Sequence, residues 1–294
     1  MSHFTVAVIT PSLHDLERLL APFQENNMGD CPQEYLEFFD VEEEYQRSYE
    51  SESAEYVEME DGRLLSPYHA IFRVPSAQLM TLKHEVPAHL RRVQIPHREK
   101  YSTFDEYMIQ SVFGYSSRDE KTGRWGYWEN PNATWDDWQV GGRWPNMLLL
   151  RSGERANAAP IKDIFFIEQE QCEGITVEIQ GITIPATLAP QLESCIAEAS
   201  QEWDTVMEGE HSSEIAYYIH RYVNKQGFLR DVLSINTYAV LTPDGVWHTP
   251  GEMGRFGIGS ESPEEAREFS TSFYATFIQN ADPEHFLVIV DCHI

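Results

Sequence analysis

Five of the chain's seven tryptophans lie within twenty residues, at Trp125, Trp128, Trp135, Trp138 and Trp144. Each indole combines a large apolar surface with an N–H group that needs a hydrogen-bond acceptor when it is buried. Such a concentration indicates either a packed structural clamp or a binding pocket. It constrains the fold more than any other feature, because the rest of the chain must supply the surface against which these rings pack.

The centre of this stretch is NPNATWDDWQVGGRW, residues 130–144. Asn130-Pro131 predicts a turn, because a residue that precedes proline avoids the α region. Trp135 and Trp138 are three apart, which predicts one face of a helical turn. The two glycines allow a positive φ or a close approach of another segment. The residues of this structural clamp or pocket are Trp135, Asp136, Trp138, Gly141, Gly142, Arg143 and Trp144.

Both ends of the chain predict strands of one sheet. Residues 3–10 are almost continuously apolar and rich in β-branched side chains, as expected of a central strand. Residues 286–291 form a similar closing strand. Ser12 is a plausible N-cap for a short helix that carries leucines at helical spacing and ends before Pro22. We therefore predict an α+β fold, with a mixed or antiparallel sheet that contains both chain termini and helices on one face.

The remaining elements predict a second, smaller α/β lobe within residues 156–230. Apolar periodicity predicts helices at 188–208 and about 213–223, and Gly227 is expected to mark a break after them. Residues 231–294 contain a hairpin closed by TPDG and a helix that begins at Ser262-Pro263. The predicted regions are thus 1–155, 156–230 and 231–294.

Charge is the strongest global feature, with 48 acidic residues against 21 basic ones and a formal net charge of −27. Such a charge repels nucleic acid and anionic membranes, and it favours a basic partner. No apolar run approaches the roughly 20 residues needed to cross a bilayer. The N-terminal residues lack the features of a signal peptide, so we expect a soluble, cytoplasmic protein.

Residues 31–61 are densely acidic and are interrupted by aromatic side chains. This pattern is typical of an amphipathic helix over a core, of a solvated helix face, or of a partner-binding arm. The predicted partner-binding residues of this acidic arm are Tyr35, Phe38, Phe39, Glu42, Glu43, Glu44 and Tyr45. Basic residues between Arg73 and Lys100 are expected to neutralise the arm within the molecule.

Motifs of catalysis and cofactor binding are missing from the sequence. It contains no Walker loop, dinucleotide fingerprint, HExxH or nucleophile elbow. The glycine-rich loop at 251–259 lacks the spacing of a phosphate cradle. His248, Asp291, Cys292 and His293 could converge on a metal ion, but no ligand spacing supports such a site. We therefore predict no metal, no cofactor and no catalytic residues, and four separate free cysteines.

Several segments resemble a widespread family of small phage-encoded proteins. They are SHFTVAVIT with LLAPFQEN, the tryptophan stretch, TYAVLTPDGVWHTPGEMGRFGI and the ending FLVIVDCHI. Within that setting, the length and acidity are similar to those of phage inhibitors of the bacterial Gabija defence complex. The resemblance implies a non-enzymatic oligomer that acts in the host cytoplasm, encloses the defence complex and blocks its DNA-binding and nuclease function.

Two other functions remain open on the sequence alone. One is a small-molecule or nucleotide-binding protein or enzyme, with a pocket lined by Trp135, Trp138, Arg143 and Trp144. The other is a virion structural protein. The leading expectation is a phage anti-defence protein that forms a homo-oligomer and binds a host protein complex through its basic, DNA-facing surface, without binding nucleic acid directly.

Overall fold

The chain forms two compact units in the computed structural model. Unit 1 consists of Met1–Tyr35 and Asn132–Ile294, and unit 2 consists of Leu36–Pro131. Unit 2 is therefore inserted into unit 1, and the boundary falls inside the tryptophan stretch, at a position that the predicted regions did not mark. The structure describes residues 2–75, 82–111, 117–168, 174–252 and 259–294. None of the described helices is long and apolar enough to cross a membrane.

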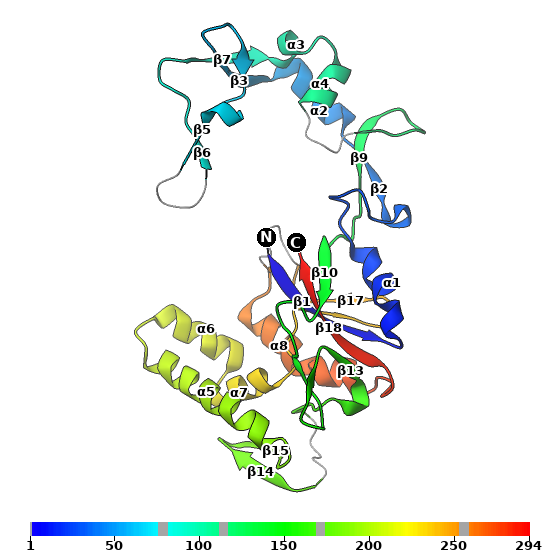
Figure 1. The fold of residues 1–294 in the computed structure, drawn as a ribbon, viewed down its shortest axis with the longest axis vertical. Coiled ribbons are helices and arrows are strands. Elements are labelled where there is room, and N and C mark those ends of the chain that lie inside the picture. The colour runs from blue at the N-terminus through cyan, green and yellow to red at the C-terminus, as the bar shows by residue number, and fades with distance from the viewer. Residues whose placement is uncertain (1, 76–81, 112–116, 169–173, 253–258) are drawn as a thin grey trace. The chain divides into compact units, whose positions relative to one another are not determined.

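A mixed six-stranded sheet forms the centre of unit 1, and it contains both the first and the last strand, as predicted (Figure 1). The central strand β1 (His3–Thr10) pairs antiparallel with β18 (Phe286–His293) and parallel with β16 (Ala239–Leu241). Strand β17 (Trp247–His248) forms a hairpin with β16 and lies at one edge of the sheet. At the other edge, β18 pairs with two short strands, β10 (Asp137–Val140) and β13 (Ala158–Pro160).

Strands β1 and β18 are apolar along most of their length because both faces of the sheet are covered. Ala7 and Ile9 belong to one hydrophobic cluster, and Val6 and Val8 belong to a second cluster on the opposite face. All four side chains are at most 1% exposed. This two-sided burial explains why the sequence shows a continuous apolar run instead of alternation.

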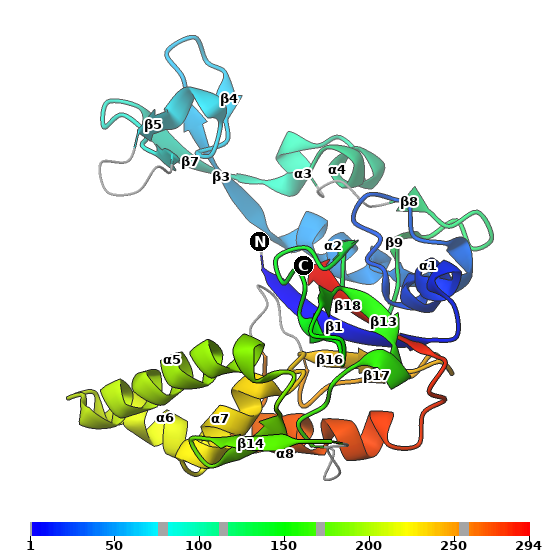
Figure 2. The same cartoon turned by 60° about the horizontal axis from the view of Figure 1, so that its bottom comes forward.

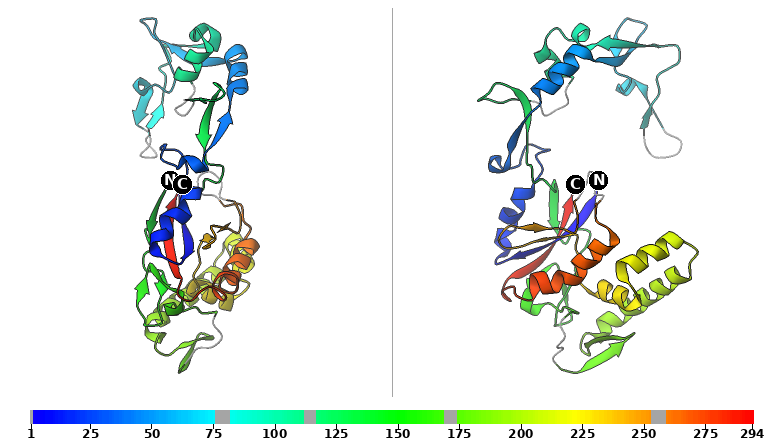
Figure 3. Two further views of the ribbon diagram at one scale, coloured as in Figure 1. Left: turned by 90° about the vertical axis from the view of Figure 1, so that its right-hand side faces the viewer. Right: turned by 180° about the vertical axis from the view of Figure 1, so that it is seen from behind.

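Helices cover both faces of this sheet, whereas the sequence predicted helices on one face. Helix α8 (Pro263–Phe273) and the π-helix that follows it (Tyr274–Ile278) pack with Ala7 and Ile9 (Figure 3). Helix α1 (Leu16–Leu20) packs with Val6 and Val8. Its three leucines were visible in the sequence, but the face that they cover depends on the path of the chain after β1.

Capping of two helices agrees with the sequence. Ser12 accepts a hydrogen bond from the backbone of the 3-10 helix that leads into α1. Ser262 and Glu265 form a complete capping box at α8. The α-helix α1 ends at Leu20, before Pro22, as predicted, and a short 3-10 helix over Ala21–Phe23 accommodates the proline in its first turn.

A third hydrophobic cluster organises the middle of the chain. The helices α5 (Ala189–Glu208), α6 (Ser212–Tyr222) and α7 (Lys225–Leu233) pack together (Figure 2). The hairpin of β14 (Thr176–Ile179) and β15 (Ile182–Pro185) contributes Ile182 and Ile184 to the same core. The predicted break at Gly227 is wrong. This glycine lies in the first turn of α7, where its backbone N–H donates to the capping side chain of Asn224.

Unit 2 is built from small sheets and a cluster of aromatic residues. Its longest helix is α2 (Glu42–Ser51), and its main sheets are β2-β9-β8 and β4-β3-β7. Tyr101, Tyr107, Met108 and Trp125 are its buried aromatic and apolar core. The strands and helices of the unit are β2 (Glu37–Asp40), α2, β3 (Ser53–Glu58), β4 (Leu64–Leu65), a 3-10 helix (Ala70–Phe72), β5 (Arg73–Pro75), β6 (Leu82–His84), β7 (Arg91–Pro96), α3 (His97–Lys100), α4 (Phe104–Gln110), β8 (Ser117–Arg118) and β9 (Trp125–Glu129).

Unit 1 also has several short elements around its sheet. They are the 3-10 helices Leu13–Asp15, Gln33–Tyr35 and Ile161–Asp163, and the strands β11 (Leu148–Leu149), β12 (Arg155–Ala156), β14 (Thr176–Ile179) and β15 (Ile182–Pro185). Most of the glycine-rich loop, residues 253–258, lies outside the described residues.

Replacing Leu287 with alanine tests the assignment of the last strand to the core. Its side chain is fully buried in the cluster on the α8 face, and Leu287 pairs in register with Ile9, so the substitution leaves a cavity in that cluster. We expect the free energy of unfolding to fall by about 2–5 kcal/mol, measured by denaturant unfolding. Leu13, which is 43% exposed, is the matched control, and Leu13→Ala should change stability little. Equal effects of the two substitutions would contradict the placement of β18.

Candidate functional site

The tryptophan stretch forms an edge strand and a turn of unit 1, and the predicted helical turn is wrong. Trp138 lies in β10, while Trp135 precedes it and forms an isolated bridge with Gln24. Both indoles belong to the cluster on the α1 face of the sheet, where Trp135 is 4% exposed and Trp138 is half-buried. A spacing of three residues is compatible with a shared face here because Trp135 lies before the regular strand begins.

Trp135 joins the stretch to the N-terminal segment. Its indole N–H donates to the Leu20 carbonyl oxygen at 3.2 Å, and the backbone N–H of Thr134 donates to Phe23 at 2.8 Å. The Asn27 amide donates to Asp136 at 3.2 Å. The buried indole is therefore fully satisfied, which supports the interpretation of this half of the stretch as a structural clamp.

A buried carboxylate, Asp291, fixes the second half of the stretch. Trp138 and Gln139 pair in register with Cys292 and Asp291 of β18. The Asp291 side chain is held between two donors: the backbone N–H of Arg143, at 2.9 Å, and Nδ1 of His3, at 2.8 Å. Strand β18 thus sets the direction of the chain as it leaves β10.

The turn that follows β10 depends on glycine. Gly142 has a φ of +41°, and a Cβ atom built on it would lie 2.3 Å from Oδ2 of Asp291. Gly141 has a φ of +75° and would place a Cβ atom against the side chain of Asn157. No larger residue fits either position without displacing the neighbouring side chain. The same Asn157 side chain accepts the backbone N–H of Asn146, so Asp291 and Asn157 together hold the turn.

Two histidine–aspartate pairs lie at the end of this sheet. His3 contacts Asp291, His293 contacts Asp136 through Nδ1, and the two imidazole rings lie 4.8 Å apart. Cys292 and His248, which the sequence offered as conditional partners of these residues, lie elsewhere. Cys292 points into the cluster on the opposite face, and His248 packs against Phe277. Among the described residues, no group of three His, Cys, Asp or Glu side chains is arranged to hold a metal ion.

A cavity of about 530 Å³ lies beside the turn. We call it the loop cavity: it is bounded by residues 143–147, by Leu149, Arg155 and Phe165, by Leu192 and Cys195 of helix α5, and by residues 231–236. Of the four residues expected to line a pocket, Arg143 and Trp144 line it, whereas Trp135 and Trp138 pack in the α1-face cluster. No local sequence pattern predicts that Arg155, Leu192 and Cys195 join them, because the packing of α5 brings these residues together.

Burial raises the pKa of the Cys195 thiol above its ordinary value, and Glu198 adds to this effect while Arg155 opposes it. The thiol is therefore largely protonated near neutral pH, and because the thiolate is the reactive form, Cys195 is a weak nucleophile. Cys31 and Cys292 are free and buried, and burial raises the pKa of Cys292 as well.

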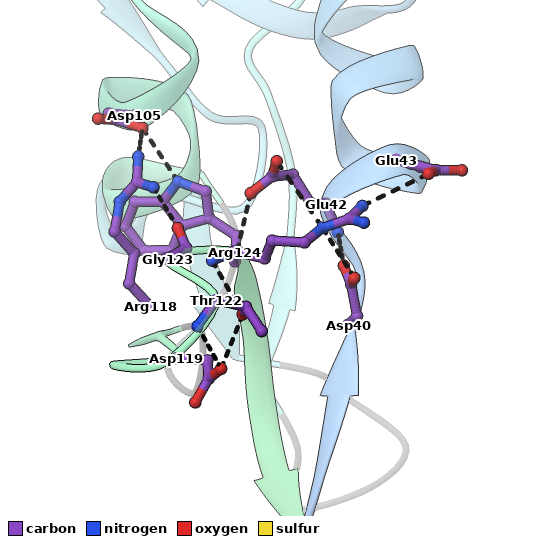
Figure 4. A network of polar contacts seen from close by, with 10 residues as sticks. Asp40, Glu42, Glu43, Asp105, Arg118, Asp119, Thr122, Gly123 and Arg124 are labelled. Atoms are coloured by element: carbon purple, nitrogen blue, oxygen red, sulfur yellow. Dashed lines mark hydrogen bonds and ion pairs between the residues drawn. The ribbon is translucent and has the colours of Figure 1, made fainter.

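The predicted acidic arm lies mainly in unit 2, where arginines neutralise much of its charge (Figure 4). The Arg124 guanidinium pairs with Asp40 at 2.8 Å and also lies near Glu42 and Glu43. Glu42 in addition accepts the backbone N–H of Trp125. The prediction that basic residues neutralise the arm is confirmed by the ion pairs Arg92–Glu55 and Arg91–Glu58 between β7 and β3.

The arm's aromatic residues have different surroundings. Phe38 and Phe39 lie on β2 and contact Trp128 and Tyr127 of β9. Tyr45 packs against the aromatic core of unit 2, and burial raises its pKa. Tyr35 belongs to unit 1. The solvent-facing members of the predicted contact set are Phe39, which is 37% exposed, with Glu43 and Glu44.

Comparison of the chain with protein-family models, with curated proteins and with solved structures finds no match.

Gly142→Ala tests the contact between the turn and the terminal strand. The new methyl group meets Asp291 and the backbone has a positive φ, so we expect a loss of about 2–5 kcal/mol of stability. Gly29 is the matched control, because its φ is +74° but a Cβ atom there meets nothing within 4 Å. Gly29→Ala should lose only the backbone term, about 1–2 kcal/mol. Thermal and denaturant unfolding measure the stability of both variants. If Gly142→Ala loses no more stability than Gly29→Ala, the contact between Gly142 and Asp291 is refuted.

Trp135→Ala tests the clamp. The side chain is buried and its N–H is bonded, so we expect a loss of about 3–5 kcal/mol. Trp138 lies half-buried on the edge strand, and Trp138→Ala should cost no more than about half as much. The stabilities of the two variants are compared by the same unfolding measurements. A larger effect at Trp138 would show that the burial of the two indoles is reversed.

Proposed function

We propose that this chain is a non-catalytic binding protein that acts on a host antiviral complex, in keeping with the phage inhibitors of the Gabija complex that its sequence resembles. It acts in the host cytoplasm as a homo-oligomer, and it blocks a basic, DNA-facing surface by protein–protein contact. The resemblance supports the setting and the partner. The distribution of charge over the two units supports the mode of binding.

The observation that carries the proposal is the excess of negative charge in unit 1. Residues 36–131 contain 18 acidic and 11 basic residues, a net charge of −7. The rest of the chain contains 30 acidic and 10 basic residues, a net charge of −20. Because unit 1 carries most of the excess, it supplies most of the attraction toward a basic partner.

Helix α5 concentrates this charge. It contains five carboxylates and no lysine or arginine. Its buried stripe, which includes Leu192, Ile196 and Trp203, packs into the third hydrophobic cluster, so the acidic residues point to solvent. Asp204 pairs with Lys225, and Glu202 accepts a hydrogen bond from Tyr218. The remaining carboxylates, Glu193, Glu198 and Glu208, are exposed and form no ion pair within the described part of the chain.

The neighbouring helix α6 adds exposed apolar side chains. Tyr217 is 48% exposed and Ile219 is 49% exposed, and Val223, directly after the helix, is 57% exposed. Aromatic and aliphatic side chains supply most of the binding energy in protein interfaces, while surrounding charges set the rate of association and the choice of partner. We define the acidic helical surface as Glu193, Glu198, Glu208, Tyr217, Ile219 and Val223, and we propose it as the main contact. The exposed arm residues Phe39, Glu43 and Glu44 form a second contact.

Charge reversal tests which surface binds. We expect E193K/E198K/E208K to lower the association rate with the purified defence complex about tenfold or more, with a reduced dependence on salt. E43K/E44K tests the arm separately and should have a smaller effect. Surface plasmon resonance measures the rates, and sedimentation velocity gives the oligomeric state of each variant.

The control E17K/E129K/E154K makes the same change in net charge at exposed positions outside both surfaces. It should bind nearly as the parent protein does. If it loses as much binding as the α5 variant, only the total charge matters and the acidic helical surface is not the contact. If no variant changes binding, electrostatic attraction to a basic partner is excluded.

A further inference from the structure

The loop cavity is lined by positive charge in a strongly acidic protein. Arg143 and Arg155 both line it, and within the described part of the chain neither guanidinium forms an ion pair with a carboxylate. Most other arginines with a described contact behave differently: Arg18, Arg63, Arg91, Arg92, Arg118, Arg124 and Arg221 each pair with Asp or Glu. With acidic residues outnumbering basic ones by more than two to one, two uncompensated arginines at one cavity indicate an anionic ligand.

The carboxylate of the cavity does not cancel this charge. Asp231 is 10% exposed at its side chain and pairs with the buried Arg221 at 2.9 Å. It also accepts hydrogen bonds from Ser270 and Asn236. Asp231 is therefore already neutralised by its own partner, and Nη1 of Arg221 still lacks a hydrogen-bond partner among the described residues. The local balance at the cavity remains positive.

Trp144 offers an unused aromatic surface at the same cavity. Trp125 and Trp135 both donate their indole N–H groups to acceptors within the protein. The half-buried indole of Trp144 has neither an acceptor nor a ring contact in the described part of the chain. Phe165 and Leu192 extend the apolar wall, and Ser234 and Asn236 add polar groups. An aromatic wall next to guanidinium groups suits a planar ring that carries an anionic group.

We propose that the loop cavity binds a small molecule of the 5′-mononucleotide class. Arg143 and Arg155 bind its phosphate, and the ring lies against Trp144. The volume of about 530 Å³ lies within the range of pockets that hold ligands of this size. Asp291 and Gly142 are positioning residues, because they fix the turn that presents Arg143 and Trp144.

The net charge of the protein opposes an anionic ligand at long range but not inside the cavity. At physiological ionic strength the Debye length is about 8 Å, so exposed carboxylates farther away are largely screened. Hydrogen bonds between guanidinium and phosphate act at contact distance and are charge-assisted. Glu193, Glu198 and Glu208 do not line the loop cavity, so the proposed binding does not depend on the function proposed above.

Titration calorimetry of the full chain with AMP, GMP, CMP and UMP, in buffer of about physiological ionic strength, tests the proposal. We expect at least one mononucleotide to bind. R143Q/R155Q should weaken that binding by about tenfold or more, since it removes two charge-assisted contacts. Trp144→Leu should also weaken it. The control R18Q/R63Q, which removes the same two charges at surface ion pairs, should bind as the parent does.

Alkylation of Cys195 gives a second readout at the same site. N-ethylmaleimide should modify Cys195 slowly, as judged by peptide mass spectrometry, and the bound mononucleotide should slow it further. Cys31 and Cys292 are buried and report any loss of the fold. The variants are compared only where these two thiols remain unmodified and the melting temperature matches that of the parent.

Four outcomes would overturn the proposal. The first is no binding of any of the four mononucleotides at millimolar concentration. The second is binding that R143Q/R155Q leaves unchanged, because the arginines would then not hold the phosphate. The third is equal affinity for inorganic phosphate and the nucleotide together with no effect of Trp144→Leu, because the cavity would then be an anion site without a ring-binding wall. Equal binding of the matching nucleoside would exclude the phosphate contact.

Discussion

The buried carboxylate of Asp291 connects the parts of unit 1 that lie farthest apart in the sequence. It is 6% exposed, and its oxygens accept hydrogen bonds from His3 on the first strand and from the backbone of Arg143. A buried charge is tolerated only where donors surround it. The close approach of Gly142 to this carboxylate, the register of β10 on β18 and the pairing of β1 with β18 all meet at this one side chain.

This arrangement brings together four separate segments of the sequence. The opening strand, the LLAPFQEN segment, the tryptophan stretch and the DCHI ending are separated in the sequence but contact one another in unit 1. Trp135 bonds to Leu20, Asp136 contacts His293, and Asp291 holds Arg143. These four segments therefore form one packed cluster of contacts in unit 1. Its outer side presents Arg143 and Trp144 to a cavity, so a clamp and a pocket wall are built by the same fifteen residues.

Charge is divided unequally between the two units. The acidic arm is conspicuous in the sequence because its carboxylates follow one another closely. In the fold, strand β7 and Arg124 bring basic side chains alongside them. Helix α5 is less conspicuous in the sequence, since its carboxylates are spaced by apolar residues. That spacing places the carboxylates of α5 on the solvent side, where few basic side chains pair with them.

The sequence by itself determined the elements whose signals are local. These include the strands at both ends, the long helix α5, the hairpin β16–β17 and the capping box at Ser262, because periodicity, turn residues and caps act within a few positions. Only the tertiary structure decided that α1 covers the second face, that Trp138 lies in a strand, that residues 36–131 form an inserted unit, and that Arg155 and Cys195 join Arg143 at one cavity. Those features depend on contacts between segments more than a dozen residues apart. Such contacts form where burial and hydrogen bonding can be satisfied together, and no local pattern encodes that choice.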